Sequence, residues 1–241
     1  MIRVQGGISE TDFSWLLESG ECFQTPEAVL AYSAEGLGGM SRAFHDLWRE
    51  RPLSPRFAAT HRPIVVNSWE ALYFDLDRNK IFSLIDAAAE IGADTFVLDD
   101  GWFAHRDNDN GGLGDWNVDY KKLPGGLREV GEHCRKRGLS FGLWFEPEMV
   151  SEDSRLYAEH PDWCLRNPLR GPVRGRAQLV LDLCNPQVVD AVFEKMAAAV
   201  EESGAKYLKW DMNRYLADLY APSLPPERQR EVQHRYVLGV Y

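Results

Sequence analysis

The sequence contains no long apolar run and no excess of basic residues, and each absence excludes a class of protein. No apolar stretch approaches the roughly 20 residues of a membrane-spanning helix. The first residues, MIRVQGGISE, contain neither the basic nor the apolar region of a secretion signal. The formal net charge of −10 speaks against a surface that follows the phosphates of a nucleic acid. We therefore expect a soluble, cytoplasmic protein with neither a membrane nor a nucleic acid as partner.

Cysteine is also scarce, and phosphate-binding loops are missing. The cysteines lie far apart, without a CxxC pair or a neighbouring group of histidines: Cys22, Cys134, Cys164 and Cys184. This spacing indicates neither a zinc site nor a disulfide framework, so we expect reduced, mostly buried thiols. No GxGxxG, GxxxxGKS or GxxxxGKT segment follows an apolar run, so a nucleotide cofactor is not indicated.

After residue 63, short apolar segments alternate with longer amphipathic ones, a pattern typical of βα units in a parallel sheet. The predicted strands are 64–68, 95–98, 140–145, 178–183 and 207–210, and the predicted helices are 79–91, 127–136, 154–159, 187–202 and 227–241. Acidic and aromatic residues follow these strands. Because the carboxyl ends of the strands form the active-site face of a (β/α)8 barrel, this placement favours a barrel over a doubly wound sheet. Four or five strands correspond to about the first half of such a barrel.

The remaining segments predict a division into three parts. Residues 1–35 mix short aromatic and β-branched runs, which fits the last strands of a β domain. Residues 36–60 are expected to be a linker with a helix at 38–51, which Pro52 would end. Residues 61–241 are then the first part of the barrel.

The clearest chemical pattern is YLKWDMNR, which ends the last predicted strand. Lys209, Asp211 and Asn213 alternate along it, so their side chains point to the same face. A cation and an amide beside a carboxylate favour its ionised form, which a glycosidic nucleophile requires. The alternative is that Asp211 caps the next helix while Lys209 forms a structural ion pair. The three-residue alternation favours the functional interpretation.

A second acidic pattern is FVLDDGWF, which contains Asp99 and Asp100 at a strand end. Adjacent residues of a strand face opposite ways, so the two acids share a site only if the chain bends there. We expect them to accept hydrogen bonds from sugar hydroxyls. One alternative is a metal site with Glu146 and Glu148 as further ligands, and another is a purely structural pair of acids.

Aromatic residues beside these acids suit a sugar site, because flat ring faces pack on the apolar faces of a sugar. Trp69 in NSWEA and Trp144 in FGLWFEPEMV are candidates for this role, although each is explained equally well as a packing residue. Arg176 precedes a predicted strand and is able to reach the site from its loop, but a lone arginine in a loop is more often solvated.

The motifs NSWEA, FVLDDGWF, LGDW, FGLWFEPEMV, HPDW, LVLDL and YLKWDMNR occur in the order and spacing of bacterial α-galactosidases, and from about Glu21 onward the chain resembles glycoside hydrolase family 36. The resemblance implies a (β/α)8 catalytic barrel that follows a β-sandwich domain, of which residues 1–35 match only the tail. It also implies retaining hydrolysis, by double displacement, of terminal α-galactosyl residues in oligosaccharides of the melibiose and raffinose type, without metal or cofactor. An α-N-acetylgalactosaminidase, a galactosyl transferase and a truncated, inactive fragment with residual sugar binding are alternatives, and a full-length homo-oligomer is compatible with the resemblance.

The resemblance also implies a role for each matching residue. Asp211 matches the nucleophile that forms a covalent galactosyl-enzyme, Lys209 and Asn213 match residues that contact sugar hydroxyls, and Asp99 and Asp100 match those that bind the axial 4-OH and the 6-OH. The other matching residues are expected to form the walls and rim of the pocket: Trp69, Trp144 and Arg176. The acid/base of the family is an aspartate on a later strand, and no residue here matches it. The chain by itself is therefore expected to be inactive and poorly stable.

Overall fold

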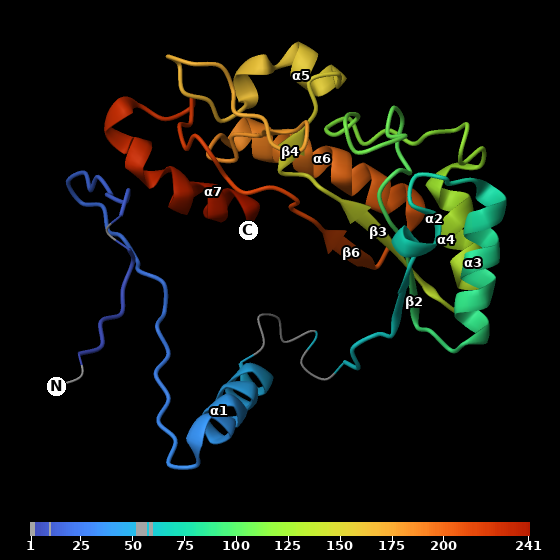
Figure 1. The fold of residues 1–241 in the computed structure, drawn as a ribbon, viewed down its shortest axis with the longest axis horizontal. Helices are drawn as coiled ribbons and strands as arrows, with labels where there is room; N and C mark the ends of the chain where they lie inside the picture. Colours follow the sequence, from blue (N-terminus) through green and yellow to red (C-terminus); the bar gives the residue numbers. More distant parts are fainter. Residues whose placement is uncertain (1–2, 10, 52–56, 58–59) are drawn as a thin grey trace. The chain divides into compact units, whose positions relative to one another are not determined.

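The computed structural model describes the chain except residues 1–2, 10, 52–56 and 58–59. Its internal contacts divide the chain into two units, Met1–Arg62 and Pro63–Tyr241. The strands assigned among the described residues all belong to the second unit. Figure 1 labels four of them, β2, β3, β4 and β6.

In the first unit, helix α1 (Gly36–Glu50) is the element that the structure describes, and none of its residues is buried. The helix begins slightly before the predicted range 38–51, whereas Pro52, which was expected to end it, lies outside the described residues. No strand is assigned in the described part of residues 1–35. A strand forms only where it pairs with a neighbour, so the interpretation of this segment as the end of a β domain stays a prediction.

The second unit is built on a four-stranded sheet in the order β1-β2-β3-β6, in which all neighbours are parallel. Its strands are β1 (Val65–Asn67), β2 (Thr95–Leu98), β3 (Ser140–Phe145) and β6 (Tyr207–Trp210). The parallel α/β character predicted from the sequence is confirmed. Four parallel strands in this order are what the first half of a (β/α)8 barrel contains.

The register of the sheet brings the carboxyl ends of its strands together. Asn67 pairs with Val97 at the end of β1, and Phe145 pairs with Trp210 at the ends of β3 and β6. Residues that directly follow these strands therefore meet at one edge, which is where the sequence places its acids.

Helices connect the strands at positions close to those predicted. They are α2 (Trp69–Leu72), α3 (Arg78–Glu90), α4 (Gly126–Lys136), α5 (Arg155–Glu159), α6 (Pro186–Ser203) and α7 (Val232–Val240), with short 3-10 segments η2 (Pro161–Trp163) and η3 (Pro226–Glu231). Side-chain caps explain three of the starts, because Asp77, Ser154 and Asn185 accept backbone N–H bonds at the starts of α3, α5 and α6. α4 contacts both α3 and α6 beside the sheet (Figure 1). None of the helices among the described residues is both long and apolar enough to span a bilayer.

The structure corrects the prediction of a strand of the parallel sheet at 178–183. Only Leu179–Val180 forms a strand, β5, and it pairs antiparallel with β4 (Met149–Val150) outside the parallel sheet. Both strands are buried, and an apolar run of this length indicates burial without indicating which strand it pairs with. Asp182, which follows this run, is also buried, and its carboxylate accepts hydrogen bonds from the hydroxyl and backbone N–H of Ser223.

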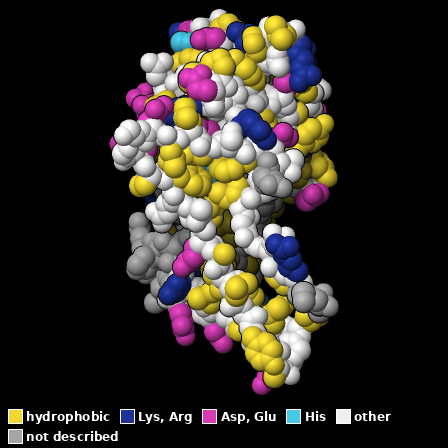
Figure 2. All heavy atoms as spheres, turned by 90° about the vertical axis from the view of Figure 1, so that its left-hand side faces the viewer, with side chains coloured by type: hydrophobic (Ala, Val, Ile, Leu, Met, Phe, Trp, Pro, Cys, Tyr) yellow, Lys and Arg dark blue, Asp and Glu magenta, His cyan; other side chains and the backbone are white. Residues whose placement is uncertain are grey.

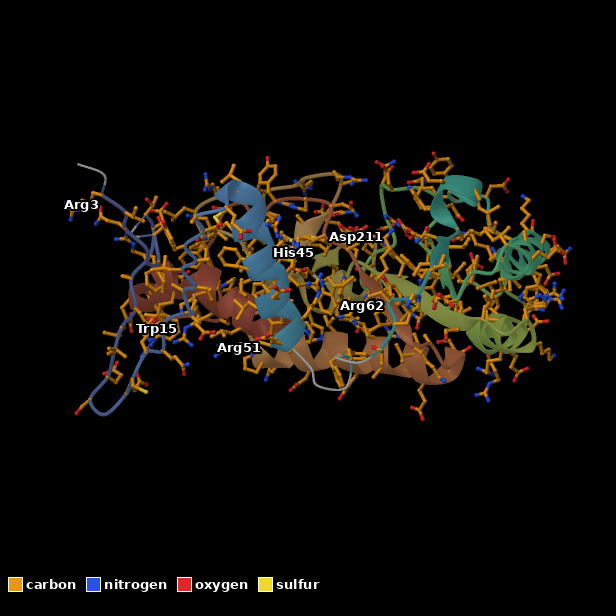
Figure 3. The ribbon with its side chains drawn as sticks, turned by 90° about the horizontal axis from the view of Figure 1, so that it is seen from below. Arg3, Trp15, His45, Arg51, Arg62 and Asp211 are labelled. Atoms are coloured by element: carbon orange, nitrogen blue, oxygen red, sulfur yellow. The ribbon has the colours of Figure 1, made fainter. Side chains whose placement is uncertain are left out.

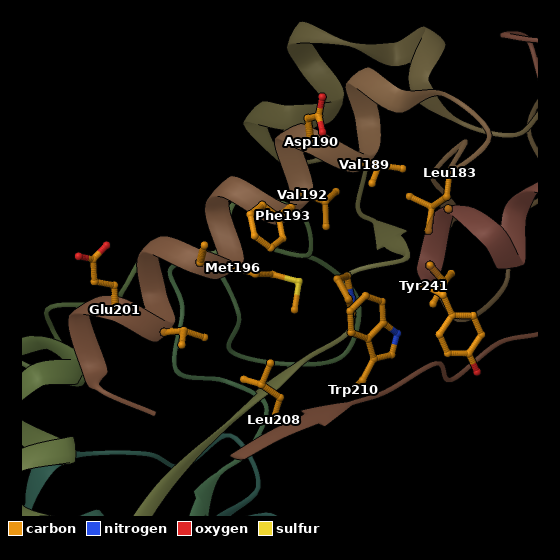
Figure 4. Close-up of a pocket in the computed structure, with 15 residues that line it drawn as sticks. Leu183, Val189, Asp190, Val192, Phe193, Met196, Glu201, Leu208, Trp210 and Tyr241 are labelled. Atoms are coloured by element: carbon orange, nitrogen blue, oxygen red, sulfur yellow. The ribbon is translucent and has the colours of Figure 1, made fainter. Parts of the chain in front are cut away.

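An apolar cavity of about 570 Å³ lies between α6, β6 and the end of α7. Figure 4 shows that Leu208 and Trp210 of β6 line this cavity together with Phe193 and Met196 of α6. Hydrocarbon side chains dominate its lining, so it lacks the convergent hydrogen-bonding groups that a sugar requires.

The surface and the cysteines complete the description. On the face shown in Figure 2, Lys and Arg side chains are separated from one another by acidic, apolar and other side chains, so this face carries no basic stripe. All four cysteines are free thiols. Cys134 and Cys164 are buried as predicted, whereas Cys22 is exposed.

Candidate functional site

A pocket of about 210 Å³ opens at the carboxyl ends of the parallel strands. All the site residues predicted from the sequence line it: Trp69, Asp99, Asp100, Trp144, Arg176, Lys209, Asp211 and Asn213. They follow or end β1, β2, β3 and β6, with Arg176 contributed by the loop before β5. Residues spread over more than half of the sequence therefore meet in one small cavity.

The alternation predicted for the end of β6 is present. Lys209, Asp211 and Asn213 line the acidic pocket, whereas Leu208 and Trp210 line the apolar cavity next to α6. Asp211 lies directly after the last residue of β6 and is labelled in Figure 3. The alternative that Asp211 caps a helix is wrong, because the next helical segment begins only at Pro226.

The Asp211 carboxylate is held by neutral donors. Its Oδ2 accepts hydrogen bonds from Trp144 Nε1 at 3.0 Å and from Asn213 Nδ2 at 2.8 Å, and its Oδ1 accepts one from the Met212 backbone N–H at 2.9 Å. The lysine expected to stabilise its charge points elsewhere, since Lys209 Nζ donates to Asp99 at 2.6 Å. The ion pair weighed for Lys209 thus exists, and both its members line the pocket.

Asp99 is buried and is contacted from several directions. Its Oδ2 accepts hydrogen bonds from Lys209 Nζ and from Asn67 Nδ2, the latter at 2.5 Å, while its Oδ1 accepts one from the Asp100 backbone N–H. Asn67 ends β1, and its own Oδ1 accepts a hydrogen bond from the Trp69 backbone N–H. The ends of three strands are therefore tied together at this carboxylate.

Asp99 and Asp100 share the pocket because the chain bends directly after them, at Gly101, whose φ is +101°. The Asp100 carboxylate receives a two-pronged contact from Arg106, with Nε 2.9 Å from Oδ1 and Nη2 2.7 Å from Oδ2. Burial raises the pKa of Asp100, and the hydrogen bonds and charge of Arg106 oppose that rise. The bend that the shared-site interpretation required is present.

Trp144 combines the two roles between which the sequence did not decide. Its ring is buried against Phe103, at a centroid distance of 6.3 Å, and against Trp116, at 6.1 Å. Its Nε1–H points to Asp211, so a packed aromatic cluster fixes the direction of that hydrogen bond. Trp69 lies edge-on to Phe74, which also lines the pocket.

Glu146 and Glu148, the further ligands of the metal alternative, are bound by protein donors. Glu146 Oε1 accepts a hydrogen bond from the Asn213 backbone N–H at 2.7 Å, and Glu148 accepts bonds from Trp210 Nε1 and Tyr236 OH, both at 2.8 Å. Glu146 is fully buried, which raises its pKa. Within the part of the chain that the structure describes, no group of three or more His, Cys, Asp or Glu residues is arranged to hold a metal ion.

Comparison with known proteins gives the family. The chain matches the Melibiase family over residues 22–241. This chain belongs to the Melibiase family. It is 50% identical to α-galactosidase AgaA of Geobacillus stearothermophilus over 99% of its own length and 33% of that protein. It is 48% identical to α-galactosidase 1 of Pediococcus pentosaceus over 100% of its length and 33% of that protein.

A crystal structure of a variant of AgaA in complex with raffinose is similar to this Melibiase chain with a TM-score of 0.93 and 49% identity. The similarity covers 98% of this chain and 33% of that one. The chain therefore spans about a third of the length of the relatives that it matches.

Three lining residues of this Melibiase chain were not predicted: Phe74, Arg106 and Asp109. Asp109 lies 3.8 Å from Arg176, which is half exposed at the pocket, so Arg176 is not simply a solvated loop residue. Arg106 and Asp109 occur in a polar loop, HRDNDN, that contains no apolar run or repeated spacing. The position of Arg106, a few residues after the acidic pair Asp99 and Asp100, is the one feature of the sequence that indicates a contact with these acids.

Proposed function

We propose that this chain supplies the nucleophile and the galactose-binding pocket of a retaining α-galactosidase. The proposed substrates are oligosaccharides of the melibiose and raffinose type, from which a terminal α-galactosyl residue is removed. The observation that carries the proposal is the position of Asp211, which shares a small pocket with Asp99 and Asp100 but pairs with neither of the cations that hold them. The α-galactosidase names of the relatives and the raffinose complex of AgaA support the choice of substrate.

The hydrogen bonds separate the proposed nucleophile from the proposed binding acids. Both oxygens of Asp100 accept hydrogen bonds from Arg106, and one oxygen of Asp99 accepts a bond from Lys209. The negative charge of each carboxylate is therefore balanced by a cation, and its orientation is fixed. Among the residues that the structure describes, the donors to Asp211 are all neutral N–H groups. Its Oδ1 accepts a single backbone bond and retains a lone pair for attack.

In the proposed reaction, Asp211 attacks the anomeric carbon of the galactosyl group while the bond to the leaving oxygen breaks, and an acid protonates that oxygen. Water then cleaves the galactosyl ester of Asp211 after the same acid, now a base, removes a proton from the water. We propose that this acid/base comes from sequence outside residues 1–241, as the family pattern implies. A retaining mechanism requires the two carboxyl groups to lie about 5 to 5.5 Å apart.

The size of the pocket favours removal of one sugar at a time. At about 210 Å³ it is smaller than the roughly 300–1,000 Å³ of sites for drug-sized ligands, so a single ring is the group expected to enter. Within it, Asp99 and Asp100 are proposed to accept hydrogen bonds from the 4-OH and 6-OH of galactose. Trp69 and Trp144 are proposed to contact the apolar face of the ring.

We further propose that residues 1–35 complete a β-sandwich domain, that residues 36–60 link it to the barrel, and that residues 61–241 begin the catalytic barrel. The division found at Arg62 supports the second of these boundaries. The Melibiase match covers residues 22–241 and so includes the whole of the proposed barrel segment.

The test is hydrolysis of raffinose by the full-length protein, followed by proton NMR to identify the anomer of galactose released first. Release of α-galactose is expected, and Asp211→Asn is the matched control without a nucleophile. Release of β-galactose first would contradict double displacement. A protein that cleaves only α-N-acetylgalactosaminides, or only transfers galactose to another sugar, would replace the proposed activity by the corresponding alternative.

A further inference from the structure

Arg106 is almost completely buried, with 2% of its surface exposed, and it lies in the wall of the acidic pocket. Three of its nitrogens donate hydrogen bonds, two of them to Asp100 and the third, Nη1, to the Gly111 carbonyl at 2.7 Å. The planar guanidinium thereby matches the plane of the carboxylate, which a lysine ammonium cannot do. Each of the three guanidinium nitrogens thus donates to a protein acceptor.

The main chain around Arg106 is held as firmly as its side chain. Lys122 Nζ donates to the carbonyl of Arg106 at 2.9 Å and to that of Gly101 at 3.0 Å. The guanidinium also lies over the Phe74 ring, 5.6 Å from its centroid. The loop between Asp100 and Gly111 is therefore closed around this cation.

We propose that Arg106 is a positioning residue, which fixes the plane of the Asp100 carboxylate and keeps it ionised so that Asp100 accepts a hydrogen bond from a galactoside hydroxyl. This proposal rests on the proposed function. A buried carboxylate without a partner would favour its protonated form, and a protonated Asp100 would be a donor on one oxygen. Burial does raise the pKa of Asp100, while Arg106 lowers it.

Other charged side chains around the pocket also influence the protonation of Asp100. The charged side chains that line it with Asp100 are Asp99, Arg106, Asp109, Arg176, Lys209 and Asp211. Lys209 is committed to Asp99, and Arg176 lies near Asp109. Arg106 is therefore the cation in direct contact with Asp100, and its removal leaves the negative charge of Asp99 to raise the pKa of Asp100 further.

The experiment compares Arg106→Ala, Arg106→Lys, Asp100→Asn and the double variant Arg106→Ala with Asp100→Asn in the full-length protein, with an aryl α-galactoside as substrate. For Arg106→Ala we expect KM to rise about 10- to 100-fold, with a smaller change in kcat, because a charge-assisted contact to substrate is lost. The acidic limb of kcat/KM should move to higher pH, since Asp100 then protonates more readily. In Arg106→Lys the acidic limb of kcat/KM should move less than in Arg106→Ala, because lysine restores the positive charge without the planar contact.

Arg155→Ala is the matched control, because Arg155 also pairs with a carboxylate, that of Glu159, but on the exposed surface. It should leave KM and the acidic limb unchanged. In the Asp100→Asn background, removal of Arg106 should add little to KM and should not move the acidic limb. A purely structural role would instead lower the melting temperature without moving the pH profile.

An unchanged KM and acidic limb in Arg106→Ala, or an equal loss with and without Asp100, would overturn the proposal. If Arg106→Ala does not fold, Arg106→Gln, which also removes the charge but keeps a side chain of similar length, replaces it in the same comparison. A wild-type protein that hydrolyses α-galactosides while its Arg106 variants behave normally rejects only this inference, whereas a wild-type protein without α-galactoside hydrolysis rejects the proposed function and this inference together.

Discussion

The ends of β2 and β6 both present carboxylates to the same pocket, but they hold them in different ways. After β2, Asp99 and Asp100 are each in contact with a cation, Lys209 and Arg106 respectively. After β6, Asp211 is surrounded by neutral N–H donors. A carboxylate with a cationic partner is well suited to fix a hydroxyl, whereas one without such a partner is available to form a bond. These three aspartates therefore differ in their partners and not in residue type, and this difference supports the roles proposed for them.

The largest effect is expected from Asp211→Ala in the full-length protein. Turnover of an aryl α-galactoside should fall by several orders of magnitude, because the covalent route is removed. Azide should partly restore the rate by occupying the space of the missing carboxylate. Steady-state kinetics with and without azide measure both effects, and near wild-type rates in this variant would show that Asp211 is not the nucleophile.

Replacement of Asp99 or Asp100 by Ala should weaken the binding of galactose by about 1.5 to 3 kcal/mol each, the range for hydrogen bonds to a charged group. Glucose should lose less, since its 4-OH is equatorial. Competitive inhibition by the two sugars measures the difference. Equal losses for galactose and glucose would contradict the proposed distinction between binding acids and nucleophile. Asn variants at the same positions also leave the cation without a charged partner but keep a side-chain acceptor, so they separate the two effects.

Trp144→Phe tests the neutral donors around Asp211. The variant keeps an aromatic ring but loses the 3.0 Å hydrogen bond to Oδ2, so kcat should fall by roughly 10-fold or more while the protein stays folded. Trp210→Phe is the matched control, since its Nε1–H donates to Glu148 at 2.8 Å instead of to a residue of the pocket. A similar loss of kcat in both variants would point to general destabilisation of β3 and β6.

The smallest effect is expected at Glu146, which accepts a hydrogen bond from the Asn213 backbone N–H in the segment after β6. Burial raises its pKa, so the folded state binds a proton more tightly than the unfolded state does. Wild-type stability therefore falls as the pH rises through the range above the ordinary pKa of glutamate. Glu146→Gln removes this loss and should gain melting temperature relative to wild type as the pH increases from 4 to 8 in a thermal denaturation series. A constant difference over that range would contradict the shifted pKa.

Much of the fold was predictable because the information is local. β2, β3 and β6 begin and end where the sequence predicts them, since each is a short apolar run followed by acids, Gly or Pro. The segment 178–183 failed because its apolar residues require burial but do not encode which strand they pair with. The contact expected between Lys209 and Asp211 is absent for a similar reason, because Lys209 instead pairs with Asp99, which is distant along the chain.

The sequence by itself determined the parallel α/β class, the family and the set of acids and aromatics that converge on one pocket, because strand periodicity and strand ends are written in neighbouring residues. Only the tertiary structure decided which cation serves which carboxylate. Arg106 reaches Asp100 because the chain turns at Gly101, and Lys209 reaches Asp99 across the sheet. Such contacts depend on the folding of distant segments against one another, and electrostatic interactions of a few ångströms are set by that packing and not by separation along the chain.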